Sequence, residues 1–254
     1  MKIWKHIPNL LTCANLVFGF YACILALSGD YSGAMAAILV AAGFDFADGF
    51  AARLLNAFSP IGKDLDSLAD VVSFGVAPGM MLFDFLNRLQ QTVEWSNPLT
   101  GKFFLLAACA IPVFSALRLA KFNNDKRQTD SFIGLPVPAH ALFWAPLIYV
   151  LSLYIEGNPS SGLFPGLLSI RLTTIPACYL LFFTSFTVIG FSLLLVSEIH
   201  FMSLKIKSIT WKGNEIRFVL VIAAAVSMIC FGFLGITISI LLYMFLSIFD
   251  KSSR

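Results

Sequence analysis

The chain has 254 residues, of which 58% are hydrophobic and 12% are charged, and its formal net charge is +3 at pH 7. Soluble domains are about 45–50% apolar, so this composition excludes an ordinary soluble domain and predicts a polytopic membrane protein. The basic residues are dispersed rather than clustered, which argues against nucleic acid as a partner. The five cysteines are odd in number and form no CxxC pair, which argues against a disulfide framework or a zinc site.

A helix needs about 20 apolar residues to cross a bilayer, and runs that approach this length recur along the chain. We expect an all-α fold, a polytopic helical bundle of about eight transmembrane helices. The expected spans lie near residues 8–28, 32–58, 64–87, 101–123, 136–155, 173–196, 216–232 and 235–250. The last two share one apolar run and depend on a turn at GFLG, residues 232–235. Without that turn the chain would have seven spans.

The N-terminal segment and the distribution of basic residues along the chain predict the membrane topology. The N-terminal MKIWKHIPNL is followed by an apolar run with no clear small-residue cleavage site, so we expect a retained first helix rather than a signal peptide. If this end is cytoplasmic, 14 of the 17 basic residues lie in cytoplasmic segments, and only Arg88, Lys102 and Arg171 lie outside. Cytoplasmic loops carry an excess of Lys and Arg. We therefore expect both termini on the cytoplasmic side.

The stretch DFADGFAARLLNAFSPIGKDLDSLAD, residues 45–70, places five aspartates between two apolar runs. Residues three or four apart on a helix are neighbours, so Asp45 and Asp48 share one face of the second span. Gly49 and Ala52 follow each of them by four residues and leave room on that face. On the third span Gly62, Asp66 and Asp70 recur at a spacing of four, whereas Asp64 points the other way. A turn near residues 59–60 would make the two helices antiparallel, so that four carboxylates converge.

Four carboxylates in a poorly hydrated site repel one another and need cations. Ligands that are all oxygen suit Mg²⁺ or Mn²⁺, and two such ions could share these aspartates. Metals held in this way typically engage substrate phosphates. Two other interpretations remain open at this point: acids within the membrane also occur in the ion pathways of transporters, and small residues such as Gly49 and Ala52 also serve helix packing.

The same stretch resembles the CDP-alcohol phosphatidyltransferase family. It matches the pattern D-x2-D-G-x2-A-R-x8-G-x3-D-x3-D without a gap, through the residues Asp45, Asp48, Gly49, Ala52, Arg53, Gly62, Asp66 and Asp70. The resemblance implies an integral-membrane enzyme that transfers a phosphatidyl group from a CDP-linked lipid to an alcohol and releases CMP. It also implies that the four aspartates bind two divalent ions and that Asp70 serves as the general base.

Other segments resemble the branch of that family that uses serine, the phosphatidylserine synthases. They are IPNLLTCANLVFG (7–19), DSLADVVSFGVAP (66–78), ALRLAKFN (116–123), FIGLPVPA (132–139) and LLVSEIHFMSLK (194–205). In ALRLAKFN the branch usually has arginine where this chain has Lys121, which keeps the charge but loses the planar fork. The resemblance implies CDP-diacylglycerol and serine as substrates and a homodimer. Glycerol phosphate or inositol phosphate as the acceptor, and more remotely a cation transporter, are the alternatives.

The expected membrane domain contains two groups of candidate site residues. We expect a single membrane domain over residues 1–254, with a catalytic core near 8–155; the spans near 173–250 complete the bundle and supply dimer contacts. The residues expected at the nucleotide and lipid headgroup are Asn9, Thr12, Asn15, Gly49, Ala52, Arg53 and Gly62. The residues expected to hold the serine carboxylate or the lipid phosphate are Arg118, Lys121, Asn123 and Arg127.

Each group of candidates has a structural alternative. Thr12 and Asn15 are three apart on the first helix and could hydrogen-bond cytosine or ribose, or could instead join helices as polar side chains do within membranes. The basic residues near 118–127 could form the ordinary positive cap at the cytoplasmic end of a span. His140 and His200 have no partner at metal-ligand spacing, so we interpret both as structural or acceptor-site polar groups.

Overall fold

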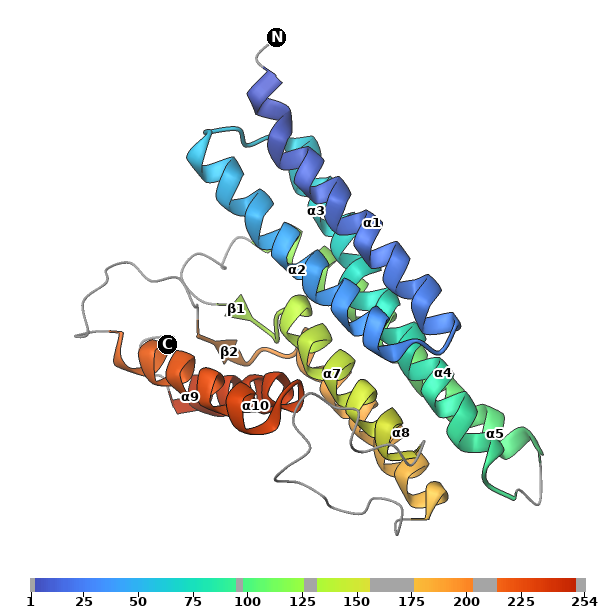
Figure 1. Ribbon diagram of the computed structural model, residues 1–254. Coiled ribbons are helices and arrows are strands. Elements are labelled where there is room, and N and C mark those ends of the chain that lie inside the picture. The colour runs from blue at the N-terminus through green and yellow to red at the C-terminus, as the bar shows by residue number, and fades with distance from the viewer. Residues whose placement is uncertain (1–2, 95–97, 126–131, 156–175, 203–213, 250–254) are drawn as a thin grey trace.

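A computed structural model describes residues 3–94, 98–125, 132–155, 176–202 and 214–249 (Figure 1). Its helices are α1 (Ile7–Leu27), α2 (Tyr31–Leu54), α3 (Pro60–Asp70), α4 (Ala77–Gln91), α5 (Pro98–Leu105), α6 (Ala110–Asn124), α7 (Val137–Ile155), α8 (Ala177–Val196), α9 (Glu215–Phe231) and α10 (Leu234–Phe249). The 3-10 turns η1 (Ile3–His6) and η3 (Leu106–Cys109), the π-helical turn η2 (Val71–Val76) and the two-residue strands β1 (Phe132–Ile133) and β2 (His200–Phe201) complete it.

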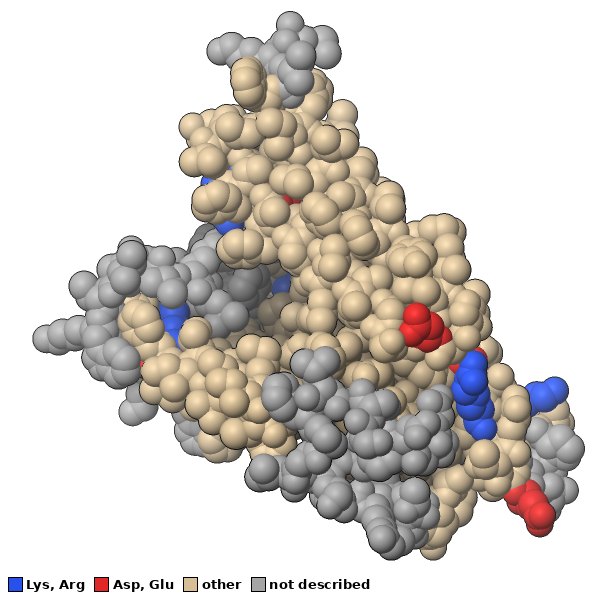
Figure 2. All heavy atoms as spheres, in the orientation of Figure 1, with Lys and Arg blue, Asp and Glu red and all other residues tan. Residues whose placement is uncertain are grey.

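The expected all-α membrane bundle is confirmed. Among the described residues, five helices are long and apolar enough to cross a membrane: Ile7–Leu27, Tyr31–Leu54, Pro60–Gln91, Leu99–Asn124 and Ala177–Val196. Two of them are composite, because α3 continues through η2 into α4 and α5 continues through η3 into α6. Val137–Leu153 and Leu234–Ser247 are shorter apolar helices. Figure 2 fits this setting, since the face over α1 and α2 is almost free of charged side chains.

The last two helices form the expected hairpin, but each is shorter than a perpendicular span. The turn lies at Gly232, whose φ of 59° is a left-handed conformation that glycine adopts without strain. α9 has 17 residues and α10 has 16, against the about 20 that a bilayer requires. In Figure 1 the pair runs across the direction of α7 and α8. The turn at residues 232–235 is therefore confirmed, and neither α9 nor α10 is among the described helices that are long enough to span a membrane.

The turn between the second and third spans ends at the expected position near residues 59–60, although the helix ends differ from the expected ones. α2 ends at Leu54 rather than near residue 58, and α3 begins at Pro60 rather than near residue 64. Ser59 caps α3, because its hydroxyl accepts a hydrogen bond from the Gly62 amide at 3.0 Å, and proline follows at the first helical position. The hydropathy pattern missed this start because Gly62, Lys63 and Asp64 interrupt the apolar residues in the first two turns of α3.

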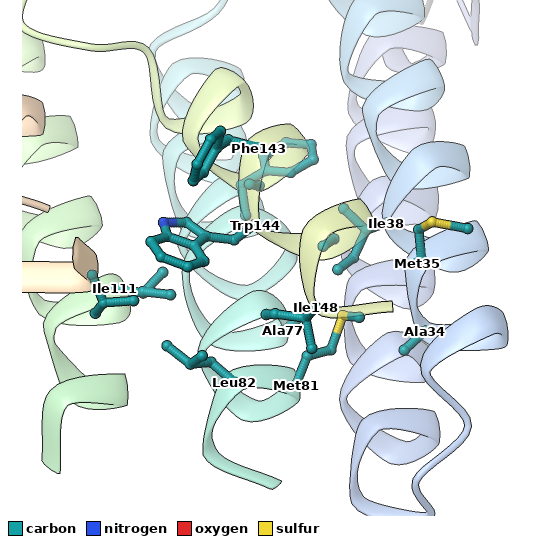
Figure 3. Packing of buried hydrophobic residues seen from close by; sticks show 14 of the residues in the cluster. Ala34, Met35, Ile38, Ala77, Met81, Leu82, Ile111, Phe143, Trp144 and Ile148 are labelled. Carbon is teal, nitrogen blue, oxygen red and sulfur yellow. The ribbon is translucent and has the colours of Figure 1, made fainter. Parts of the chain in front are cut away.

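The buried core lies where α2, α4, α6 and α7 meet (Figure 3). Trp144 of α7 points toward Ile111 of α6, and Ile148, one turn later on α7, lies near Met81 of α4. α2 contributes small and medium side chains to the same cluster, among them Ala34 and Ile38, both fully buried. This packing fixes α2 and the composite α3–α4 span relative to each other, and these two elements carry the aspartate motif.

The two ends of the bundle are tied in different ways. At the α1–α2 turn, the Tyr31 hydroxyl donates to Asp84 Oδ2 at 2.6 Å, and Arg88 Nε donates to the same oxygen at 2.7 Å. Near the other end of α8, Phe132 pairs with Phe201 and Ile133 pairs with His200 in an antiparallel strand pair. The first contact anchors α2 on α4, and the second joins the start of α7 to the segment after α8.

Candidate functional site

The carboxylates of α2 and α3 converge as the helical spacing predicted. One oxygen from each of Asp45, Asp48 and Asp66 lies within 4.8 Å of the other two. Asp48 is buried, and the other two are partly buried. Asp64 is exposed on the opposite side of α3. The three carboxylates therefore form one acidic cluster, and each helix contributes to it the face that the spacing of its aspartates predicted.

Asp70 lies one turn beyond Asp66 and is buried, with 7% of its surface exposed. Its carboxylate is within electrostatic range of Asp45 and Asp66, although it is not part of the tight group of three. The chain turns into the π-helical segment η2 directly after Asp70. Single π turns inside α-helices are frequent at functional sites. The fourth carboxylate thus borders the cluster from its more buried side.

The first helix supplies hydrogen bonds to this cluster. The Thr12 hydroxyl donates to Asp48 Oδ2 at 2.6 Å, and Asn15 Nδ2 donates to Asp70 Oδ1 at 3.3 Å. Both α1 side chains are buried. In the structure, the side chains of Thr12 and Asn15 therefore join helices through hydrogen bonds, as their structural alternative proposed. Their role in nucleotide binding stays a prediction. Asn9 also faces the motif, since a Cβ added to Gly62 would lie 3.0 Å from its Oδ1.

The motif residues around Gly49 leave space beside the carboxylates. A Cβ built on Gly49 would meet only Arg53 Nη1, at 3.8 Å. Ala52 is partly buried, and Arg53 is exposed near the end of α2. Small side chains on this face allow a ligand to approach the helix closely, and an exposed guanidinium beside them can bind a phosphate. The arrangement is compatible with the headgroup role predicted for these residues.

The predicted acceptor residues separate into two environments. Arg118 is buried, its guanidinium lies 4.7 Å from the centre of the Phe122 ring, and it is within electrostatic range of Asp70 and the Tyr243 hydroxyl. Lys121 instead forms a salt bridge with Glu198 at 2.6 Å. Arg118 therefore belongs to the surroundings of Asp70, whereas Lys121 joins α6 to the segment after α8.

The remaining candidates lie near the ends of α3 and α6. Asn123 Nδ2 donates to Ser67 Oγ at 2.8 Å, and the Asn123 carbonyl accepts from Lys63 Nζ at 3.0 Å. Asn123 thus connects α6 to the helix that carries Asp66 and Asp70. Arg127 lies outside the described residues. Ser67 escaped the sequence interpretation because neither its residue type nor its spacing distinguishes it from other polar residues.

The two candidate histidines have structural surroundings. His140 is fully buried, and its Nε2 accepts a hydrogen bond from Trp144 Nε1 at 3.2 Å. His200 is exposed and pairs through its backbone in β2. Within the described ranges neither belongs to a group of possible metal ligands. This agrees with their interpretation as structural or acceptor-site polar groups.

The acidic cluster fits a hard divalent ion. Its possible ligand atoms are all carboxylate oxygens, which Mg²⁺ and Mn²⁺ prefer. Asp66 Oδ1 is buried and has no hydrogen-bond partner, so it retains the capacity to bind a cation. In the part of the chain that the structure describes, no basic side chain forms a salt bridge with these aspartates. A bound divalent cation would offset their mutual repulsion.

Comparisons with known proteins agree with this geometry. The described part of the chain combines five helices that are long and apolar enough to cross a membrane with an acidic cluster that could hold a metal ion. The sequence model of the CDP-alcohol phosphatidyltransferase family matches residues 5–177. The chain therefore belongs to the CDP-alcohol phosphatidyltransferase family, whose members are membrane-bound transferases that depend on divalent metals.

Several curated relatives are similar to the chain. It is 36% identical over 134 residues to the CDP-diacylglycerol–serine O-phosphatidyltransferase of Bacillus subtilis, covering 53% of this chain and 70% of that protein. The protein of the same name from Mycobacterium tuberculosis is 34% identical over 201 residues, with 76% and 59% covered. The archaetidylserine synthase of Methanothermobacter thermautotrophicus is 32% identical over 153 residues, with 59% and 58% covered. The alignments thus span 58–70% of these relatives' own lengths.

Proposed function

We propose that the protein transfers the phosphatidyl group of CDP-diacylglycerol to the hydroxyl of L-serine, giving phosphatidylserine and CMP. The observation that carries the chemistry is the acidic cluster of Asp45, Asp48 and Asp66, with Asp70 beside it. Support for serine comes from the relatives, which are named CDP-diacylglycerol–serine O-phosphatidyltransferase and archaetidylserine synthase. It also comes from a buried arginine near Asp70, which suits the carboxylate of an amino acid.

The acidic residues would hold the divalent ions. Asp45, Asp48, Asp66 and Asp70 would bind two Mg²⁺ or Mn²⁺ ions, which supply positive charge to offset the pyrophosphate and to stabilise the leaving CMP. The oxygens of the first three residues are close enough together to share ions. Gly49 and Ala52 would leave room beside them for the diphosphate, and Arg53, next to the open space at Gly49, would contribute a cationic contact.

Asp70 is proposed to act as the base. It accepts the proton of the serine hydroxyl, the serine oxygen forms a bond to the phosphorus that carries diacylglycerol, and the bond from that phosphorus to the CMP oxygen breaks. A hydroxyl is a weak nucleophile at neutral pH and needs such a partner. The buried position of Asp70 limits competition from water, and Arg118 nearby would hold an anionic group of either substrate.

The setting of the reaction follows from the membrane helices. The headgroup would enter from the cytoplasmic side, where the basic residues concentrate, while the acyl chains stay among the lipids. A homodimer, which the family resemblance implies, is part of the proposal. Size-exclusion chromatography with light scattering on the detergent-solubilised protein tests it: a protein mass of two chains supports the dimer, and a mass of one chain contradicts it.

An acceptor panel tests the function. The purified chain is incubated with CDP-diacylglycerol and Mn²⁺ or Mg²⁺, together with serine, glycerol phosphate or inositol phosphate, and both CMP and the lipid product are measured. We expect CMP release that depends on serine and matches the phosphatidylserine formed. Release that depends on another alcohol would overturn the serine assignment, and no release with any alcohol would overturn the transferase proposal.

A further inference from the structure

The contact between α1 and the segment after Asp70 is unusually close. A Cβ added to Gly19 of α1 would overlap both the side chain and the backbone of Ser73 in η2. Ser73 is fully buried, and its hydroxyl donates to the backbone carbonyl of Asn15 at 3.0 Å. The π-helical turn is therefore fixed against α1 at two neighbouring levels, and Asp70, immediately before it, is fixed with it.

The side chain of Asn15 completes this attachment. Asn15 is fully buried and Asp70 is 7% exposed, so their hydrogen bond of 3.3 Å is shielded from water. The same residue thus contacts η2 through its carbonyl and Asp70 through its amide. A bond to one carboxylate oxygen limits rotation of the carboxyl group and leaves the other oxygen for a proton or a cation.

Thr12 makes the equivalent contact on the second helix. It lies three residues before Asn15, so both side chains project from one face of α1. Its hydroxyl donates to Asp48 Oδ2 at 2.6 Å and lies 3.0 Å from the Pro8 carbonyl. α1 therefore contacts one aspartate of α2 through Thr12 and one aspartate of α3 through Asn15.

The chemical type of these partners matters. A lysine or arginine at either position would neutralise an aspartate and compete with a cation. A hydroxyl and an amide are neutral donors, so they orient a carboxylate and leave its charge available. Partners of this kind hold metal ligands in many proteins, and their loss typically costs about 10–100-fold in metal affinity or activity.

We infer that Thr12 and Asn15 are positioning residues, whose hydrogen-bond donors orient the carboxylates of Asp48 and Asp70. The inference rests on the proposed function, because it assigns a metal ligand to Asp48 and the base to Asp70. The contact with cytosine or ribose that the sequence suggested for this pair is the alternative that the experiment below tests.

Mn²⁺ binding without substrate, measured by electron paramagnetic resonance, and steady-state kinetics on the same purified full chain separate the two roles. Thr12→Val keeps the shape of the side chain and removes the donor, and it should raise both the Kd for Mn²⁺ and the half-saturating Mn²⁺ concentration about 10–100-fold. Thr12→Ser restores the hydroxyl and should restore the wild-type requirement. At saturating Mn²⁺ the KM for CDP-diacylglycerol should stay the same in both variants, because no nucleotide contact is lost.

Asn15 gives a second and independent comparison. Asn15→Leu removes the donor, and Asn15→Asp replaces it with an acceptor and a charge. Both should lower kcat about 10–100-fold without changing the KM for CDP-diacylglycerol. A residue that accepts a hydrogen bond from the cytosine amino group would tolerate aspartate. Wild-type kinetics in Asn15→Asp, or a raised KM with unchanged kcat in either variant, would overturn the inference for Asn15.

Two control variants separate positioning from general disturbance. Cys13→Ser changes an exposed residue between the two positions. Ser192→Ala, on α8, removes a buried hydroxyl that has no hydrogen-bond partner. Both should keep the wild-type kcat and Mn²⁺ requirement. If Thr12→Val raises only the KM for CDP-diacylglycerol, or if Thr12→Ser fails to restore the Mn²⁺ requirement, the inference fails for Thr12, whether or not the Asn15 variants fold.

Different experimental results would overturn the proposed function and this inference. If the acceptor panel identifies another alcohol, the serine assignment is wrong, and the same comparison of kcat with KM is made with that alcohol. If the panel confirms serine and the variants change only the KM for CDP-diacylglycerol, the positioning roles are wrong and the proposed function stands.

Discussion

At the scale of single residues, Asp64 and Asp66 offer the sharpest contrast, since both lie on α3 and only Asp66 belongs to the acidic cluster. Asp66→Asn keeps the shape and removes one charge, so we expect CMP release to fall about 10–100-fold or more. Asp64→Asn changes an exposed side chain and should have little effect. CMP release from membranes with matched amounts of each variant provides the measurement.

Equal losses in the two variants would contradict the register of α3. The control is the elution profile of each variant after detergent extraction, which should match that of the wild type. A variant that elutes as an aggregate reports on folding rather than on metal binding. In that case Asp45→Asn, from α2, takes its place in the comparison.

Much of the acidic cluster was predictable because it is local. Asp45 and Asp48 are neighbours through the period of one helix, as are Asp66 and Asp70 through the next, and a short turn joins the two helices. The contacts from α1 were not predictable. Thr12 is 36 residues from Asp48, and Asn15 is 55 residues from Asp70. Lys121 likewise reaches Glu198 across 77 residues, and no periodicity connects positions so far apart.

At the scale of elements, the packing of α1 on η2 should depend on Gly19. Gly19→Ala places a methyl group against the Ser73 backbone, which cannot move aside as a flexible side chain would. We expect a loss of about 1–3 kcal/mol in the free energy of unfolding, which is typical of overpacking, together with lower activity. Thermal unfolding in detergent, with phosphatidyl transfer measured in parallel, provides the test.

Gly43→Ala is the matched control on α2. A Cβ at Gly43 would meet nothing within 4 Å, and alanine favours a helix over glycine by about 1 kcal/mol. This variant should therefore keep or raise the unfolding temperature. An equal change of unfolding temperature in both variants would show that the Gly19 contact does not hold α1 against η2.

The short elements include features that the hydropathy pattern does not determine. The GFLG turn was predictable because glycine tolerates the left-handed backbone of Gly232. The direction of the α9–α10 pair was not, because an apolar helix of 16 or 17 residues has the same pattern whether it spans the bilayer or crosses the bundle at an angle. The strand pair of β1 and β2 was also missed, since two residues form no recognisable alternation.

At the scale of the whole molecule, the distribution of basic residues makes a prediction about orientation. In a variant without its native cysteines, Ser28→Cys lies in the α1–α2 turn and Asp64→Cys lies near the start of α3, and both positions are exposed. We expect a membrane-impermeant thiol reagent to label position 28 in intact cells, and position 64 only after the membrane is permeabilised. The reverse pattern would place the acidic cluster on the outer side.

In the proposed mechanism, phosphatidyl transfer takes place at the acidic cluster and Asp70 is the base. Asp70→Asn tests it most directly, because an amide can coordinate a metal weakly but cannot accept the serine proton. CDP-diacylglycerol affinity and serine-dependent turnover are measured on the same purified variant at saturating Mg²⁺ or Mn²⁺. We expect CDP-diacylglycerol binding to persist while turnover is abolished. Turnover close to that of the wild type would contradict this mechanism.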